Sequence, residues 1–389
     1  MTVAINAGVE GEALRSAALE WGDKSGTQVE VVELPYANLF EKLLLDLTSN
    51  TGAYDVIMMD DPWFPKLAEN GKLAELPAPD SDFIQSTVDV CRYPYKTGKY
   101  YAIPYVGNSQ LFFYRKDLFE RDHLEPPKTW DEVLIDASKL GFRTVLNAEL
   151  TERFGYVMRA APGNAAVTDF MPLFWAYGAD MFDAQGNPTV NSPAGVAALE
   201  MMLRLGQYSP PGYAGFNADE VAAHLLQSTA AMSINWPAWI SAMDDPQKSK
   251  VVNQIDFAQM PGERRPGQAE LGAWLLGAPS GSRNVSGAKA FIHWATGRQP
   301  MKEAAVHGNP PTRRQVFLDP DLMERFRSYP AQLKSLESAR PRPRTPQWNE
   351  IENAFGIAIS KANAGSMTAQ AAMAQAQADI AAIVSRAGK

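Results

Sequence analysis

The first sixty residues alternate between two hydrophobic periods, and this alternation constrains the fold more than any other feature. Short apolar runs at 3–6, 29–34 and 54–59 have the length and composition of strands. Between them, apolar residues recur at helical spacing from Leu14 to Trp21 and again from Leu39 to Leu47. The order β-α-β-α-β predicts a parallel sheet covered by helices, and therefore an α/β fold.

Three loops follow the predicted strands and are candidates for a binding site. In open α/β sheets, ligands bind beyond the carboxyl ends of the strands. We therefore expect the loops at Glu10, at Pro35 and Tyr36, and at 60–63 to lie along one edge of the sheet.

The remaining sequence indicates a second α/β domain. A chain of 389 residues exceeds the size at which a single core usually stops growing. The segment 100–115 joins two apolar stretches through Pro104, Gly107 and Asn108, and we place the first hinge there. Strand-like runs return at 230–240 and 271–279, and an alanine-rich helical tail begins near Trp348.

Composition excludes several classes of protein. The 36 basic and 44 acidic residues give a net charge of −8, which argues against nucleic acid or an anionic membrane as the main partner. One cysteine, Cys91, rules out an intrachain disulfide, and four scattered histidines give no zinc-ligand spacing. No window approaches the ~18 apolar residues of a membrane span. Phosphate-binding glycine loops, the HExxH zinc motif and the GxSxG nucleophile motif are all absent from the sequence.

Tryptophan is the most conspicuous residue type at predicted strand and loop ends. An indole ring can stack on the C–H face of a sugar, while Asp, Asn and Arg side chains bond its hydroxyls. Core packing is the alternative for each ring, helix capping is the alternative for Asp60, and a helix N-terminus is the alternative for Glu10. A solvated basic face is the alternative for Arg342 and Arg344.

Five segments in a fixed order resemble a known family. The chain is similar to the carbohydrate-binding extracellular solute-binding proteins of bacterial ABC importers, the group that contains the maltodextrin- and trehalose/maltose-binding proteins. The segments are YDVIMMDDPWFPKLAENGKLAEL (54–76), YYAIPYVGNSQLFFYRKDLF (100–119), TAAMSINWPAW, LGAWLLGAPSGS and PRPRTPQWNEI.

The resemblance implies a two-lobed periplasmic-binding-protein fold. Each lobe is expected to be a mostly parallel sheet flanked by helices, and a multi-strand hinge joins the lobes and lets them enclose the ligand. We expect residues 1–108 and 277–312 in the N-terminal lobe, and 109–276 and 313–389 in the C-terminal lobe.

The resemblance also implies a set of ligand-binding residues. Asn108 stands where relatives often carry an acid, and Val106 replaces an aromatic residue of relatives. Trp236 and Trp274 are expected to stack on the sugar. The full expected set is Glu10, Tyr36, Asp61, Asn108, Gly163, Trp236, Trp274 and Arg342.

The function implied is sugar transport. The chain would be a monomeric, non-enzymatic subunit, without cofactor or metal, that captures a mono- or disaccharide, a sugar derivative or a polyol and delivers it to a membrane permease. Such proteins are exported, so we expect a periplasmic protein whose signal peptide has been removed, with a lipid-anchored form as an alternative. Two other functions stay open: a glycoside-active enzyme using Glu10 and Asp61, at the ~5 to 9 Å spacing of such pairs, and a sugar-sensing partner of a receptor.

Overall fold

The chain folds into two compact units. A computed structural model describes residues 1–146 and 149–387. The first unit comprises Met1–Ser109 and Leu271–Trp348, and the second comprises Gln110–Glu270 and Asn349–Lys389. The chain therefore passes from one unit to the other three times, as a two-lobed fold requires.

The observed unit boundaries differ from the predicted ones. Residues 271–276 and 313–348 belong to the first unit, whereas the sequence predicts them in the C-terminal lobe. Backbone bonds explain the first difference, because Gly272 N–H donates to the Asn108 carbonyl and Asp61 N–H donates to the Ala273 carbonyl. The second difference reflects side-chain bonds that tie Arg313 and Arg342 to aspartates of the first unit.

The first unit is built on a five-stranded sheet in the order β2-β1-β3-β12-β6. Strand β1 pairs in parallel with β2 and β3, which confirms the predicted parallel arrangement at the start of the chain. Strand β12 is antiparallel to both β3 and β6. The strands are β1 (Thr2–Asn6), β2 (Glu30–Leu34), β3 (Val56–Asp60), β6 (Ile103–Val106) and β12 (Trp274–Gly277), with a separate hairpin of β4 (Arg92–Tyr93) and β5 (Lys99–Tyr100).

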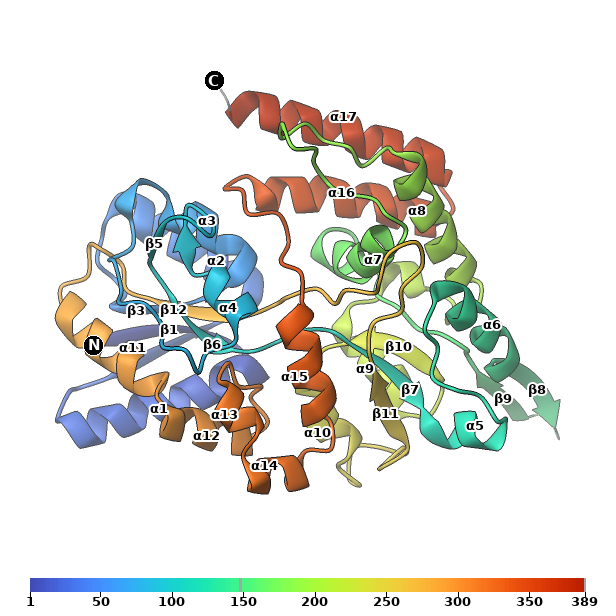
Figure 1. The fold of residues 1–389 in the computed structure, drawn as a ribbon, viewed down its shortest axis with the longest axis horizontal. Helices are drawn as coiled ribbons and strands as arrows, with labels where there is room; N and C mark the ends of the chain where they lie inside the picture. The colour runs from blue at the N-terminus through green and yellow to red at the C-terminus, as the bar shows by residue number, and fades with distance from the viewer. Residues whose placement is uncertain (147–148, 388–389) are drawn as a thin grey trace. The chain divides into compact units, whose positions relative to one another are not determined.

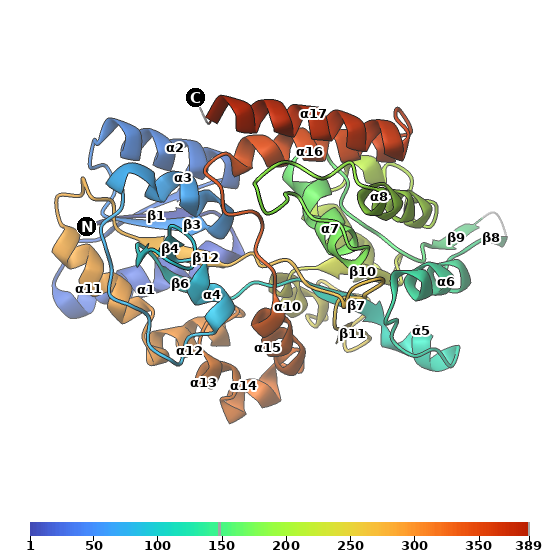
Figure 2. The ribbon, with the colours of Figure 1, turned by 45° about the horizontal axis from the view of Figure 1, so that its top comes forward.

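Helices cover both faces of this sheet. Helices α1 and α11 lie on one face and α2 and α3 lie on the other, as both views show (Figure 1, Figure 2). The helices are α1 (Val9–Ser25), α2 (Tyr36–Ser49), α3 (Phe64–Ala68), α4 (Gln85–Asp89), α11 (Val285–Ala295), α12 (Arg298–Val306), α13 (Arg314–Phe317), α14 (Pro320–Arg325) and α15 (Tyr329–Ser338), with 3₁₀ turns η1 (Asp61–Trp63) and η2 (Glu69–Gly71).

The second unit contains a three-stranded sheet in the order β10-β7-β11. Both pairs are antiparallel, so this unit differs from the mostly parallel sheet that the resemblance implies. Isolated parallel bridges join Phe154 to Ala230, beside β10, and Thr129 to Gly262. The strands are β7 (Leu111–Arg115), β10 (Met232–Asn235) and β11 (Ile255–Ala258), with a hairpin of β8 (Phe142–Leu146) and β9 (Glu149–Arg153).

One helix of the second unit, α7, could not be recognised from the spacing of apolar residues in the sequence. Residues 170–182 read as aromatic and irregular, but α7 runs through Pro172 and is buried nearly all round. Helix α17 packs on α8 (Figure 2). Arg386 of α17 pairs with Glu350 of α16. The helices are α5 (Lys116–Arg121), α6 (Trp130–Leu140), α7 (Asn164–Ala176), α8 (Pro193–Gly206), α9 (Ala218–Leu226), α10 (Ile240–Met243), α16 (Trp348–Asn363) and α17 (Ala369–Ala387), with 3₁₀ turns η3 (Tyr213–Gly215) and η4 (Pro237–Trp239).

Helix ends follow local sequence signals. Thr129 begins α6 with a capping box, in which its hydroxyl accepts from the Glu132 N–H and the Glu132 carboxylate accepts from the Thr129 N–H. Gly26 ends α1 in the left-handed conformation, with φ of 68°. Both signals are readable in the sequence, as a Thr-x-x-Glu box and as a glycine after the last helical turn.

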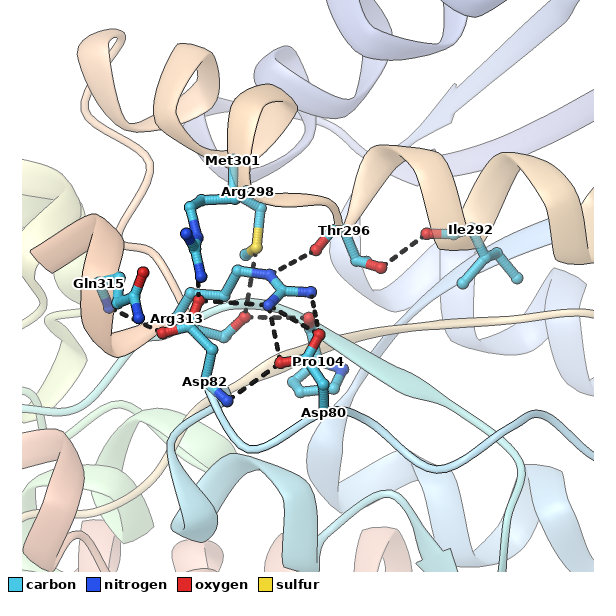
Figure 3. Close-up of polar contacts among 10 residues, drawn as sticks. Asp80, Asp82, Pro104, Ile292, Thr296, Arg298, Met301, Arg313 and Gln315 are labelled. Atoms are coloured by element: carbon cyan, nitrogen blue, oxygen red, sulfur yellow. Dashed lines mark hydrogen bonds and ion pairs between the residues drawn. The ribbon is translucent and has the colours of Figure 1, made fainter.

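A buried arginine fastens the late segment at 313 to the early segment at 80–83. The Arg313 guanidinium donates to the Asp80 carboxylate at 2.9 to 3.0 Å and to the Thr296 carbonyl at 2.7 Å (Figure 3). Its Cζ atom lies 3.9 Å from the centroid of the Phe83 ring. These contacts place residues that are far apart in the sequence in one unit.

Candidate functional site

Two aspartates and two arginines meet at the carboxyl end of β3. Arg342 Nη2 lies 3.4 Å from Asp61 Oδ1 and 3.5 Å from each Asp60 carboxylate oxygen. Arg344 Nη1 donates to Asp61 Oδ2 at 2.8 Å and to the Asp61 carbonyl at 2.7 Å. We call these four residues the Asp–Arg cluster.

Local sequence explains the geometry of this cluster. Asp60 ends β3 and caps η1, because its carboxylate accepts from the Asp61 N–H at 2.9 Å and Pro62 follows. This confirms the capping alternative for Asp60. Prolines at 341, 343 and 346 favour an extended chain, in which residues 342 and 344 lie on the same side. Both guanidiniums therefore reach the Asp61 carboxylate, and Arg342 also lies near Asp60.

The Asp–Arg cluster is almost completely buried. Asp61 is fully buried, and Arg342 is only 2% exposed, so the solvated-face alternative for Arg342 is wrong. Burial raises the pKa of the Asp61 carboxyl to about 7, although the neighbouring Arg344 and Arg342 oppose the shift and Asp60 adds to it. Burial also lowers the pKa of the Arg344 guanidinium.

An aromatic group adjoins the cluster through Tyr36. The Tyr36 hydroxyl donates to Asp60 Oδ2 at 2.7 Å. Its ring centroid lies 4.5 Å from that of Trp63 and 6.0 Å from that of Trp274, and the two tryptophans meet edge to face at 5.7 Å. Trp274 is 5% exposed and belongs to the hydrophobic core of the first unit. Its environment therefore fits core packing, which is the alternative to stacking on a sugar.

Glu10 and Asn108 are also in the first unit. Glu10 is half-buried in the first turn of α1, where a carboxylate complements the helix N-terminus. The parallel pairing of β1 with β2 and β3 confirms that the loops at Glu10, Tyr36 and Asp61 lie at one edge of the sheet. Asn108 is 3% exposed, and its Oδ1 atom accepts no hydrogen bond from the residues that the structure describes.

The second unit holds the other two predicted residues, Gly163 and Trp236. Gly163 precedes α7 with φ of 86°, a conformation that favours glycine. Trp236 follows β10 and is half-buried. Its ring centroid lies 5.5 Å from Cζ of Arg159, a residue that the sequence-based prediction missed.

The candidate site combines hydrogen-bonding side chains with aromatic rings. Across residues 1–146 and 149–387, no three His, Cys, Asp or Glu side chains are grouped so that they could hold a metal ion. None of the helices in those ranges has the length and hydropathy needed to cross a bilayer. Carboxylates, guanidiniums and a phenol beside indole rings are hydrogen-bonding groups next to apolar surface.

Two α/β units, with polar and aromatic side chains at the ends of parallel strands, define a two-lobed solute-binding protein. The sequence matches the family model of bacterial extracellular solute-binding proteins over residues 7–302, and the chain belongs to this family.

Similar proteins share this fold over nearly the whole chain. A probable amino-acid ABC transporter periplasmic-binding protein of Sinorhizobium fredii is 30% identical in an alignment of length 340, which covers 84% of this chain and 75% of the relative. The solute-binding protein of Agrobacterium radiobacter in complex with ribitol has a TM-score of 0.88 and 26% identity, covering 98% of both chains. That of Agrobacterium vitis with bound D-mannitol has a TM-score of 0.84 and 27% identity, covering 100% of this chain and 99% of the other.

Proposed function

We propose that this protein binds a neutral polyol or small sugar and delivers it to the membrane permease of an ABC importer. The Asp–Arg cluster, with the Tyr36 hydroxyl beside it, carries the proposal, because these groups offer both donors and acceptors of hydrogen bonds. Each hydroxyl of a polyol can both donate and accept a hydrogen bond, so such a ligand can use both kinds of group. The ribitol and mannitol complexes of the two similar structures support this ligand class.

The residues proposed to contact ligand come from both units. In the first unit we assign Tyr36, Asp60 and Arg342 to hydroxyl recognition, with Glu10, Asp61 and Asn108 from the predicted set. We assign Trp274 to the core and not to ligand contact. In the second unit we assign Trp236 as the ring that stacks on the ligand, and Gly163 as the residue that sets the start of α7. The unpartnered Asn108 Oδ1 supports a role as an acceptor for a ligand hydroxyl.

Binding without catalysis is part of the proposal. The buried Asp61 carboxylate is held by two guanidiniums, which suits a structural or binding role better than that of a glycosidase nucleophile. We further propose that the protein is a monomer that acts in the periplasm after removal of a signal peptide. Incubation with sugars and polyols tests the first point: stoichiometric retention without product supports binding, and turnover contradicts it.

A thermal-shift and calorimetry panel tests the ligand class. The panel contains ribitol, D-mannitol, maltose and the common amino acids, the last because of the name of the Sinorhizobium relative. A ligand at ~100 times its dissociation constant stabilises the folded state by about 2.7 kcal/mol, enough to raise the melting temperature by a few degrees in a chain of this size. Shifts by amino acids and by no carbohydrate would overturn the proposal.

The variant Arg342→Gln tests whether the ligand is neutral. Glutamine keeps a hydrogen-bonding amide but removes the charge, so a neutral polyol should lose only ~1 kcal/mol of affinity and an anionic sugar ~2 to 5 kcal/mol. Isothermal calorimetry with a polyol and with its anionic derivative measures both losses. Comparable small losses for both compounds would eliminate recognition of an anion by Arg342. Tighter native binding of the anionic derivative, with the larger loss in the variant, would contradict recognition of a neutral ligand.

A further inference from the structure

A buried ion pair lies in the second unit beside Trp236. Arg159 Nε donates to Asp169 Oδ1 at 2.6 Å, and the Arg159 backbone N–H donates to Asp169 Oδ2 at 2.7 Å. Arg159 Nη2 lies 2.5 Å from Asp169 Oδ1. Both residues are 2% exposed, so one carboxylate fixes both the side chain and the backbone of Arg159.

The Arg159–Asp169 ion pair lies in a stretch of sequence that is otherwise uncharged. Arg159 and Asp169 are the only charged residues between Arg153 and Asp180, and α7, which carries Asp169, is otherwise strongly apolar. Removing two charges from water is costly, and apolar residues of similar volume often stabilise a fold as well as such a pair does. Stability alone is therefore a weak reason for the pair.

The pair connects the elements that carry Gly163 and Trp236. The segment of Arg159 runs beside β10, where Val157 N–H donates to the Met232 carbonyl at 3.0 Å. Trp236 comes directly after β10, and its backbone N–H donates to Asn235 Oδ1 at 2.8 Å. Its ring centroid lies 5.5 Å from the Arg159 guanidinium carbon, within the range of a cation–π contact.

We propose that Arg159 and Asp169 are positioning residues for the Trp236 ring. Asp169 holds the guanidinium, and the guanidinium attracts the indole ring and limits its rotation. A ring that is already oriented loses less conformational freedom when a sugar or polyol stacks on it, so affinity increases. This inference rests on the proposed function, in which Trp236 contacts the ligand.

The test compares an apolar version of the pair with the native protein. The double variant Arg159→Met with Asp169→Leu removes both charges and leaves no buried ion unpaired. We expect its melting temperature to stay within a few degrees of the native value. Its affinity for the best-binding polyol of the panel should fall about 5- to 30-fold, the range of a desolvated cation–π contact.

Fluorine NMR reports the ring directly. With 5-fluorotryptophan at the nine tryptophan positions, the resonance lost in Trp236→Phe identifies Trp236. In the double variant this resonance should shift and broaden, while that of Trp130, which is buried in the same unit, should not change. Arg159→Lys provides a second variant, which keeps the charge but loses the planar fork, and it should restore part of the affinity.

The outcomes separate this inference from the proposed function. An unchanged Trp236 resonance in both the double variant and Arg159→Lys overturns the positioning role. Unchanged affinity in the double variant, together with weaker binding by Trp236→Ala, also overturns it. If Trp236→Ala itself binds normally, the proposed ligand contact of Trp236 is wrong, and the NMR comparison still decides whether the pair orients the ring.

Discussion

Gly356 packs so closely against Gly163 that a Cβ atom on Gly356 would lie 2.1 Å from the Gly163 carbonyl oxygen. Gly356 is in α16, and Gly163 precedes α7, so this contact sets how the two helices approach one another. Asn164, the first residue of α7, also donates to Glu352 of α16 at 3.0 Å. The start of α7 is thus fixed by a neighbour nearly two hundred residues later.

The variant Gly356→Ala tests this close approach. The added methyl group must displace backbone, so we expect the free energy of unfolding to fall by ~1 to 3 kcal/mol. Gly215→Ala in the same unit is the matched control, because no heavy atom lies within 4 Å of its Cβ position. Urea denaturation of both variants measures the effect, and equal stabilities would contradict the observed packing.

Replacing each tryptophan with alanine should separate ligand contact from core packing. Trp274 packs against Trp63 and Tyr36 in the core, so Trp274→Ala should cost ~3 to 5 kcal/mol of stability. Trp236 is half-buried, and Trp236→Ala should weaken ligand binding by ~1 to 3 kcal/mol while the fold is retained. Melting temperature and calorimetric affinity, measured on both variants, decide the assignment. The reverse pattern would mean that Trp274 is the stacking ring.

The variant Arg313→Gln should destabilise the first unit. Arg313 is 7% exposed and bonds Asp80, Asp82 and Thr296. Its loss removes a partner from the Asp82 carboxylate, whose side chain is 9% exposed, and from the buried Thr296 carbonyl, at a cost of ~2 to 4 kcal/mol. Arg298→Gln removes a 3.5 Å ion pair between a largely exposed arginine and Asp82, and it should change stability by less than ~1 kcal/mol. Chemical denaturation compares the two; similar losses would show that the interactions of Arg313 are no stronger than a surface pair.

Asp61 should make the stability of the fold depend on pH. A carboxyl whose pKa is raised to about 7 in the folded state binds its proton more tightly there than in the unfolded chain. Its contribution is then fully present below the unfolded pKa near 4 and is lost as the pH rises toward 7 and above. We expect the free energy of unfolding to decrease between pH 5 and pH 8 in the native protein.

The variant Asp61→Asn mimics the protonated acid and should remove this part of the pH dependence. Unfolding curves at pH 5, 6, 7 and 8 for both proteins give the difference that belongs to Asp61. If the native protein instead gains stability relative to the variant as the pH rises, the two arginines keep the Asp61 carboxylate ionised, and burial is the weaker effect.

Local patterns predicted much of the fold. Helix limits near Gly26 and Thr129 depend on neighbouring residues, and the parallel order of β1, β2 and β3 follows from short helical connections. The antiparallel sheet of the second unit depends on pairing Phe112 with Ile234, and no local signal indicates such distant partners. Helix α7 lacks a polar face, so its period is invisible in the sequence.

The sequence could predict which residues belong to the candidate site, but it could not predict which of them bond to each other. The sequence identifies Asp61, Tyr36 and Arg342 as candidates, but it cannot show that Asp60 receives the Tyr36 hydroxyl or that Arg344 also binds Asp61. Arginine and proline alternate at 340–344, and this pattern indicates an extended segment whose arginine side chains point to the same side of the chain. The isolated charges of Arg159 and Asp169 in an apolar stretch were a signal for pairing, and the sequence-based prediction missed it.

The place of β12 between β3 and β6 has a consequence for biosynthesis. Strands β3 and β6 are made early, but the strand that joins them begins at Trp274, after the whole first stretch of the second unit. A growing chain therefore carries two unpaired strand edges while residues 110–270 leave the ribosome, and such edges invite pairing with other chains.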